Sequence, residues 1–66
     1  MTIDETIQAI EASGFRWLLR SANNGHDFGN EGGHTHFAKV ASVVIYGNGA
    51  ANVLSTAYNA AKELAQ

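Results

Sequence analysis

The spacing of apolar residues changes twice along this chain, from helical to alternating and back to helical. Ile3, Ile7 and Ile10 recur at the i, i+4, i+7 spacing of an amphipathic helix. Residues 15–20 alternate with the period of two that is typical of a strand, and residues 50–65 return to helical spacing. Such elements bury their apolar sides by packing together in layers. The pattern therefore predicts an α+β fold in which the N- and C-terminal helices pack on one face of a small antiparallel sheet of two to three strands, in the order α-β-β-(β)-α.

The first helix has clear start and stop residues. Thr2 and Glu5 stand three residues apart, which is the spacing of a capping box. Asp4 and Glu5 place negative charge at the positive end of the helix dipole. Gly14 can adopt the left-handed conformation that ends a helix. These residues predict a helix over 3–13.

The segment "FRWLLR" predicts the first strand. One face carries Phe15, Trp17 and Leu19, and the other carries Arg16, Leu18 and Arg20. Trp17 is expected in the core between the sheet and the helices, with an exposed interface anchor as the alternative. The "NNG" at 23–25 predicts a turn, and "HDF" at 26–28 is a candidate short strand.

The segment "THFAKVASVVIY" predicts either one long bent strand or two strands joined near Ala41–Ser42. The run from Val43 to Tyr46 is apolar throughout, which favours a strand buried on both faces. Asn48 is a candidate cap for the last helix. The stripe of that helix is formed by Ala50, Val53, Leu54, Ala57, Tyr58, Ala61, Leu64 and Ala65.

Composition restricts the possible functions. The 66 residues are expected to form a single domain, 1–66, and they include no cysteine, which removes disulfides and thiolate metal sites. The formal net charge of −2 offers no bulk attraction to nucleic acid or anionic membranes. The longest apolar run, "VVIY", is far shorter than the ~20 residues of a membrane span. We expect a cytoplasmic protein without a cofactor.

The end of the chain resembles the double-stranded-RNA-binding domain. The segments "GNGAANVLSTAYNAAKELA" and "GHTHFAKV" are similar to that family's glycine turn with final helix and to its histidine-containing loop. The resemblance implies the α-β-β-(β)-α topology and a nucleic-acid-binding function. The family binds phosphates through lysines at the start of the final helix. This chain has "AANVLS" there, and its first lysine in that helix is Lys62.

The pattern "IEASGFRWLLRS", followed by a short sheet and an alanine-rich helix, resembles small proteins of phages and other mobile elements. Anti-CRISPR inhibitors are among them. This resemblance implies a non-enzymatic inhibitor that occupies a surface of a host defence complex. The partner that it implies is a complex that handles nucleic acid.

Three histidines in "NNGHDFGNEGGHTHF" form the candidate metal site. His34 and His36 would project from the same face of a strand, and His26 lies nearby in sequence. Nitrogen ligands of this kind, completed by Asp27 or Glu31, suit zinc or another divalent metal. The alternative, which we favour, is a polar glycine-rich connection that serves as a recognition loop.

No serine, histidine and acid arrangement indicates an active site, and no glycine-rich phosphate loop is present, so we expect a protein that is not an enzyme. The expected function is binding to a protein partner, with a homodimer through the sheet as an alternative. Six residues are the candidates for partner contact. They are Arg16, Leu18 and Arg20 on the second strand face, Phe28 in the polar loop, and Asp4 and Glu11 on the first helix. For the charged residues, ordinary solvation is the competing interpretation.

Overall fold

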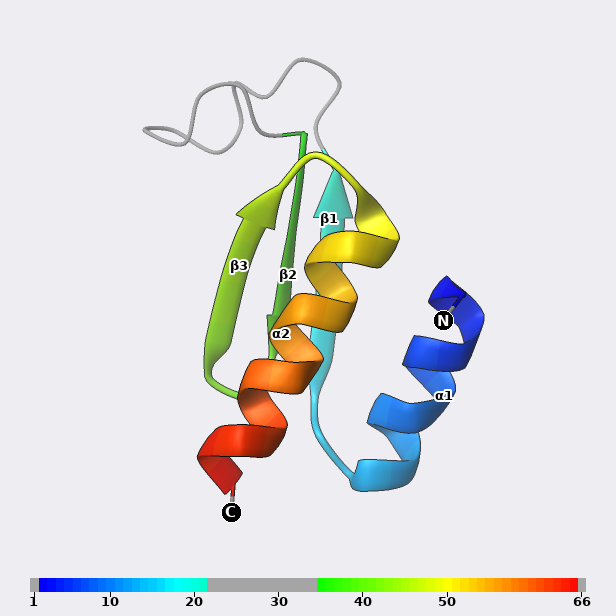
Figure 1. The fold of residues 1–66 in the computed structure, drawn as a ribbon, viewed down its shortest axis with the longest axis vertical. Helices are drawn as coiled ribbons and strands as arrows, with labels where there is room; N and C mark the ends of the chain where they lie inside the picture. Colours follow the sequence, from blue (N-terminus) through cyan, green and yellow to red (C-terminus); the bar gives the residue numbers. More distant parts are fainter. Residues whose placement is uncertain (1, 22–34, 66) are drawn as a thin grey trace.

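A computed structural model describes residues 2–21 and 35–65. It contains two helices and three strands in the predicted order (Figure 1). The elements are α1 (Ile3–Ser13), β1 (Trp17–Ser21), β2 (His36–Val40), β3 (Val43–Gly47) and α2 (Ala50–Ala65). The predicted α+β fold is confirmed.

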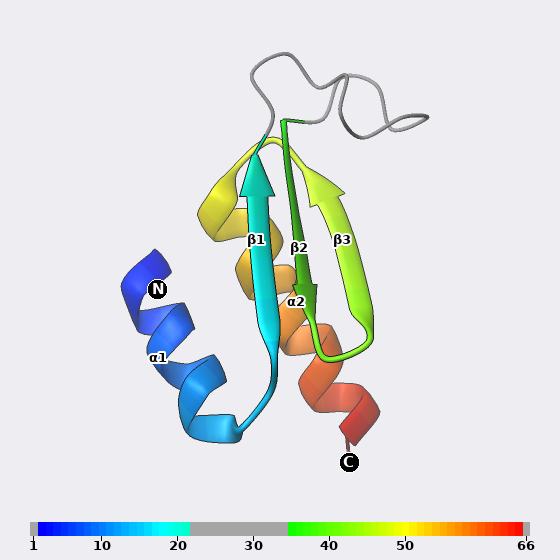
Figure 2. The same cartoon turned by 180° about the vertical axis from the view of Figure 1, so that it is seen from behind.

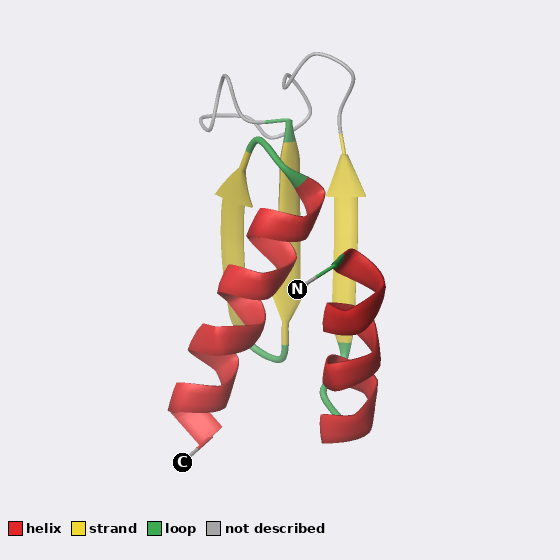
Figure 3. Cartoon of the chain, turned by 45° about the vertical axis from the view of Figure 1, so that its right-hand side comes forward, coloured by secondary structure: helices red, strands yellow, loops and turns green. Residues whose placement is uncertain are grey.

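The three strands form one antiparallel sheet in the order β1-β2-β3. Val40 of β2 pairs with Val43 of β3, so the segment after residue 35 is two strands joined by a tight turn at Ala41–Ser42. Both helices lie on the same side of the sheet, as Figure 3 shows. α2 covers the sheet, and α1 lies beside α2 (Figures 1 and 3). The molecule therefore has a helical layer and a sheet layer.

The ends of α1 form as the sequence predicts. The Thr2 hydroxyl accepts a hydrogen bond from the Glu5 backbone N–H at 3.2 Å, and the Glu5 carboxylate accepts one from the Thr2 N–H at 2.8 Å. This is the reciprocal capping box. Gly14 ends the helix with φ 82°, and its N–H donates to the Glu11 carbonyl at 3.1 Å. The left-handed conformation is one that glycine adopts without steric cost.

The capping box makes the stability of α1 dependent on pH. The backbone hydrogen bond from Thr2 lowers the pKa of Glu5 below its ordinary value. A folded-state pKa that is depressed adds stability above the unfolded-state pKa, and this stability is lost as pH falls through the folded-state value. Glu5→Gln keeps a hydrogen-bond acceptor but cannot titrate. We expect a smaller loss of thermal stability below pH 5 for this variant than for the wild type, measured by melting curves from about pH 3 to 7. Equal losses in the two proteins would contradict this role of Glu5.

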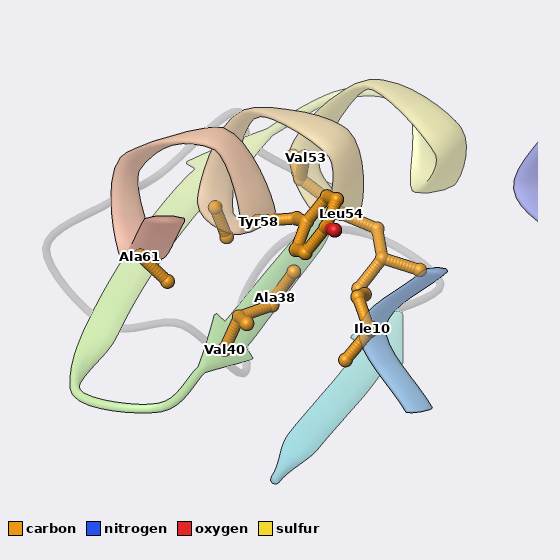
Figure 4. Close-up of a cluster of buried hydrophobic side chains, with 8 residues drawn as sticks. Ile10, Ala38, Val40, Val53, Leu54, Tyr58 and Ala61 are labelled. Carbon is orange, nitrogen blue, oxygen red and sulfur yellow. The ribbon is translucent and has the colours of Figure 1, made fainter. Parts of the chain in front are cut away.

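The core lies between α2 and the middle of the sheet. Leu54, Tyr58 and Ala61 of α2 face Ala38 and Val40 of β2 (Figure 4). Ile10 of α1 packs beside Leu54 and completes this cluster, which also includes Val53 and Ala57. Phe15, Trp17 and Leu19 are half-buried against it. The predicted core side of β1 is therefore confirmed, with Trp17 only partly enclosed.

Tyr58 joins the two helices. Its hydroxyl lies 3.2 Å from the Ser13 hydroxyl of α1, and its ring makes an edge-on contact with Phe15 at 6.3 Å between centroids. The Lys62 ammonium lies over the same ring, 4.6 Å from its centroid. Edge-on aromatic and cation–π contacts are both favourable geometries. The contacts of Tyr58 with Ser13 and Phe15 connect the end of α1 to α2, whereas the Lys62 contact lies within α2.

Two predictions for α2 are wrong. Leu64 was expected in the apolar stripe, but it is 72% exposed. Asn48 was expected to cap the helix, but α2 begins at Ala50, which leaves Gly49 at the cap position. The Gly49 carbonyl accepts the first helical bond from the Val53 N–H, whereas the Asn48 side-chain oxygen accepts from the Thr35 N–H at 3.2 Å. Asn48 therefore connects the turn after β3 to the segment before β2. Neither described helix is long and apolar enough to cross a membrane.

Candidate interaction surface on the open side of the sheet

The side of the sheet opposite the helices is formed by alternate residues of all three strands. We call it the outer face, and Figure 2 views the sheet from this side. Its members in the described strands are Leu18 and Arg20 of β1, Phe37 and Lys39 of β2, and Val44 and Tyr46 of β3. The strand register arranges them in two rows that cross the sheet, Leu18–Lys39–Val44 and Arg20–Phe37–Tyr46. Cross-strand neighbours of this kind contact one another directly.

Large apolar side chains are exposed on the outer face. Leu18, Val44 and Tyr46 are 42%, 43% and 40% exposed, and they are three of the four large exposed hydrophobic residues in the described part of the chain. β3 was expected to be buried on both faces, and this is wrong. Val43 and Ile45 are half-buried toward α2, whereas Val44 and Tyr46 project away from the helices. Val44 and Tyr46 lie on one strand, and Lys39 separates Val44 from Leu18.

Among the described residues, all acids lie on the helices, whereas most cations lie on the sheet side. The described acids Asp4, Glu5, Glu11 and Glu63 all belong to the helices. Three of the four basic residues lie on or beside the outer face, namely Arg16, Arg20 and Lys39. A net charge of −2 therefore conceals a basic sheet side, because overall charge does not report how charge is distributed. This segregation was not recognised from the sequence, since it depends on the register.

The outer face is hollowed at the end where β1 begins. A shallow hollow of about 250 Å³ is lined by Arg16, Trp17, Leu18, Lys39 and Ala41. Ala41, in the turn between β2 and β3, has φ 54°, and its N–H donates to the Arg16 carbonyl at 2.8 Å. A left-handed conformation costs a residue with a Cβ about 1–2 kcal/mol. Positive φ at this position is what a two-residue hairpin turn requires.

Phe37 and Tyr46 form an aromatic pair in the second row. Their ring centroids are 5.6 Å apart with the planes tilted by 33°. Arg20 is the neighbour of Phe37 on β1. The alternation of residues in β2 indicated that Phe37 and Lys39 share one side of the strand. It did not indicate which side of the sheet that would be. Lys39, Val44 and Tyr46 were therefore not among the predicted contact residues.

The structure places only some of the sequence-predicted site residues together. Arg16, Leu18 and Arg20 lie on or beside the outer face, as predicted. Asp4 and Glu11 are exposed on α1, on the helical side of the molecule, so they are not part of this surface. Phe28 lies outside the described residues, as do the predicted turn at 23–25 and the candidate strand at 26–28.

One of the three candidate metal ligands is described. β2 begins at His36, whose Nδ1 lies 2.8 Å from the Thr35 hydroxyl. His26 and His34 lie outside the described residues. Among the residues that the structure describes, no group of three histidine or acidic side chains is close enough to hold a metal ion. Metal binding stays a prediction that depends on residues 26 and 34.

The start of α2 differs from the pattern of the double-stranded-RNA-binding domain. Its first turn contains no basic residue, and the basic residue in its last turn is Lys62. No protein-family model, no curated protein and no solved structure matches this chain. The chemistry of the outer face is therefore the basis for a functional proposal.

Proposed function

We propose that this chain is a non-enzymatic protein-binding module and that the outer face is its binding surface. The observation that supports this proposal is the composition of one face: three half-exposed apolar residues, Leu18, Val44 and Tyr46, alternate with Arg20 and Lys39. Apolar area supplies affinity when it is buried against a partner. Surrounding cations select the partner's charge and orientation.

A protein partner fits this face better than a nucleic acid. Cations supply most of the affinity for a nucleic-acid backbone, which gains little from aliphatic side chains. Leu18 and Val44 flank Lys39 in the first row, so that much of the row is aliphatic. A small inhibitor of the phage or mobile-element type would use such a face to cover a functional surface of a host complex.

Affinity capture with surface variants tests the proposal. We expect the immobilised wild-type chain to retain a protein from bacterial lysate that Val44→Asp does not retain, because the new carboxylate is desolvated and placed against the partner. Asn59→Asp is the matched control, since it adds the same charge on the exposed side of α2. Melting curves establish that both variants are folded.

Three results would overturn the proposal. The two variants could retain the same proteins, which would exclude the outer face as the binding surface. Retention could disappear after nuclease treatment, which would support the nucleic-acid-binding function that the domain resemblance implies. Retention could require a divalent metal and disappear with chelator, which would move the site to the histidines.

A further inference from the structure

The hollow at the start of β1 combines two cations with apolar walls. Arg16 and Lys39 contribute the charges, and Leu18 and Ala41 contribute apolar side chains; Trp17, whose side chain packs toward the core, also borders the hollow. Arg16, Leu18 and Lys39 are exposed, so the hollow opens directly to solvent. The hollow lies on the outer face, and two of its lining residues, Leu18 and Lys39, belong to the row Leu18–Lys39–Val44.

Backbone hydrogen bonds hold the walls of this hollow in place. Trp17 and Leu18 pair with Val40 and Lys39 in the β1–β2 ladder. The bond from the Ala41 N–H to the Arg16 carbonyl extends this ladder beyond the end of β1. Arg16 is therefore held beside the turn although it precedes the strand. A site on rigid elements binds with a smaller loss of conformational entropy than a mobile one.

The size and charge of the hollow indicate the group that it accepts. A volume of about 250 Å³ is below the ~300 Å³ at which small-molecule pockets begin, and it suits a single side chain. Arginine and lysine together favour an anion, and the planar guanidinium matches a carboxylate with two parallel hydrogen bonds. The apolar lining suits the methylene groups that carry such a carboxylate.

No acid of this chain neutralises the two cations within the described part of the structure. Asp4, Glu5, Glu11 and Glu63 all lie on the helices, and the sheet separates the helices from the outer face (Figure 3). Arg16 and Lys39 are exposed and can therefore contact an anionic group of a bound molecule. The aliphatic residues beside the hollow favour a peptide over an inorganic or nucleotide anion.

We infer that the hollow takes a glutamate or aspartate side chain of the partner, so that the partner presents an acidic segment with apolar neighbours to the outer face. This inference rests on the proposed function and specifies the chemistry of the partner. The carboxylate lies between Arg16 and Lys39, and the apolar neighbours of the acidic residue cover Leu18 and Val44. Only non-covalent contacts form.

Titration of the ¹⁵N-labelled full chain with two peptides tests the inference. The probe is a short soluble peptide of glutamate, leucine and serine, and the matched peptide has glutamine at every glutamate position. We expect saturable amide shifts at Arg16, Leu18, Lys39 and Ala41 with the glutamate peptide and none with the glutamine peptide. Lys39→Gln or Arg16→Gln is expected to weaken binding about tenfold, because each removes a charge-assisted hydrogen bond.

Lys62→Gln is the matched control for Lys39→Gln, because it removes the same charge from an exposed lysine on α2. We expect it to change the affinity by less than about twofold, since exposed charges far apart are screened by salt. Equal effects of the two lysine substitutions, or equal binding of the two peptides, would overturn the inference. So would tighter binding of an oligonucleotide than of the glutamate peptide at the same amides.

Retention of the partner by the surface variants distinguishes a failure of this inference from a failure of the proposed function. If Val44→Asp abolishes retention but Arg16→Gln and Lys39→Gln do not, the outer face binds a partner without a carboxylate in the hollow, and only the inference is wrong. If Val44→Asp has no effect on retention, the proposed function is wrong. The proposed function and the inference are both supported only if Val44→Asp, Arg16→Gln and Lys39→Gln fail to retain the partner while Asn59→Asp retains it.

Discussion

Leu54→Ala is expected to lower the free energy of unfolding by about 2–5 kcal/mol. Leu54 is fully buried in α2, between Ile10 of α1 and the sheet (Figure 4). Truncation removes apolar contacts and leaves a cavity that the surrounding helices fill only in part. A domain of 66 residues has a low stability to begin with, so a loss of this size unfolds much of the population. Urea denaturation followed by circular dichroism measures the effect.

The same substitution at Leu64 is the matched control. Leu64 is on the same helix but 72% exposed, so Leu64→Ala is expected to change the free energy of unfolding by no more than about 0.5 kcal/mol. If Leu64→Ala lowered the free energy of unfolding as much as Leu54→Ala does, this would contradict the exposure of Leu64 near the end of α2. It would show that the exposed leucine is buried in solution, for example in a dimer.

Gly47→Ala is expected to destabilise the chain by about 1–3 kcal/mol through overpacking. A Cβ at Gly47 would lie 2.6 Å from Cγ1 of Val53, which is far inside a normal contact. Val53 is nearly fully buried in the first turns of α2. The strand and the helix must therefore separate to admit a methyl group. Thermal melting of the variant measures the cost.

A double-substitution cycle tests whether this close contact is the cause. Val53→Ala removes the methyl group that the new Cβ would meet. In the double variant Gly47→Ala, Val53→Ala, we expect a loss of stability smaller than the sum of the two single losses, since contacting residues are not additive. Strict additivity would show that the cost of Gly47→Ala arises elsewhere, in the conformation of the strand itself.

Local signals explain why α1 was predicted with its observed bounds. Thr2, Glu5 and Gly14 act on backbone groups within four residues of themselves, so their effect is visible in a short window of sequence. The start of α2 has weaker local signals. Asn48 has the chemistry of a cap, but its oxygen accepts from Thr35, which is thirteen residues away in sequence. A contact between distant segments displaced the local preference.

The residues of the outer face were predicted only in part. The period of two in β1 was sufficient to place Leu18 and Arg20 on the side away from the core. It was not sufficient to place Lys39 between Leu18 and Val44, because that neighbourhood requires two strand pairings and their register. The apolar run of β3 was misinterpreted for the same reason. No second layer of the described structure buries Val44 and Tyr46, which stay partly exposed on the outer face.

The sequence by itself determined the order of elements, the bounds of α1 and which residues share a side of each strand. These properties follow from backbone periodicity and from caps, which act over a few residues. Only the tertiary structure decided that the helices cover one face, that Arg16, Arg20 and Lys39 gather on the other, and that Ala41 joins Arg16 to form a hollow. These properties depend on pairings between segments about 20 residues apart, whose register the core packing selects.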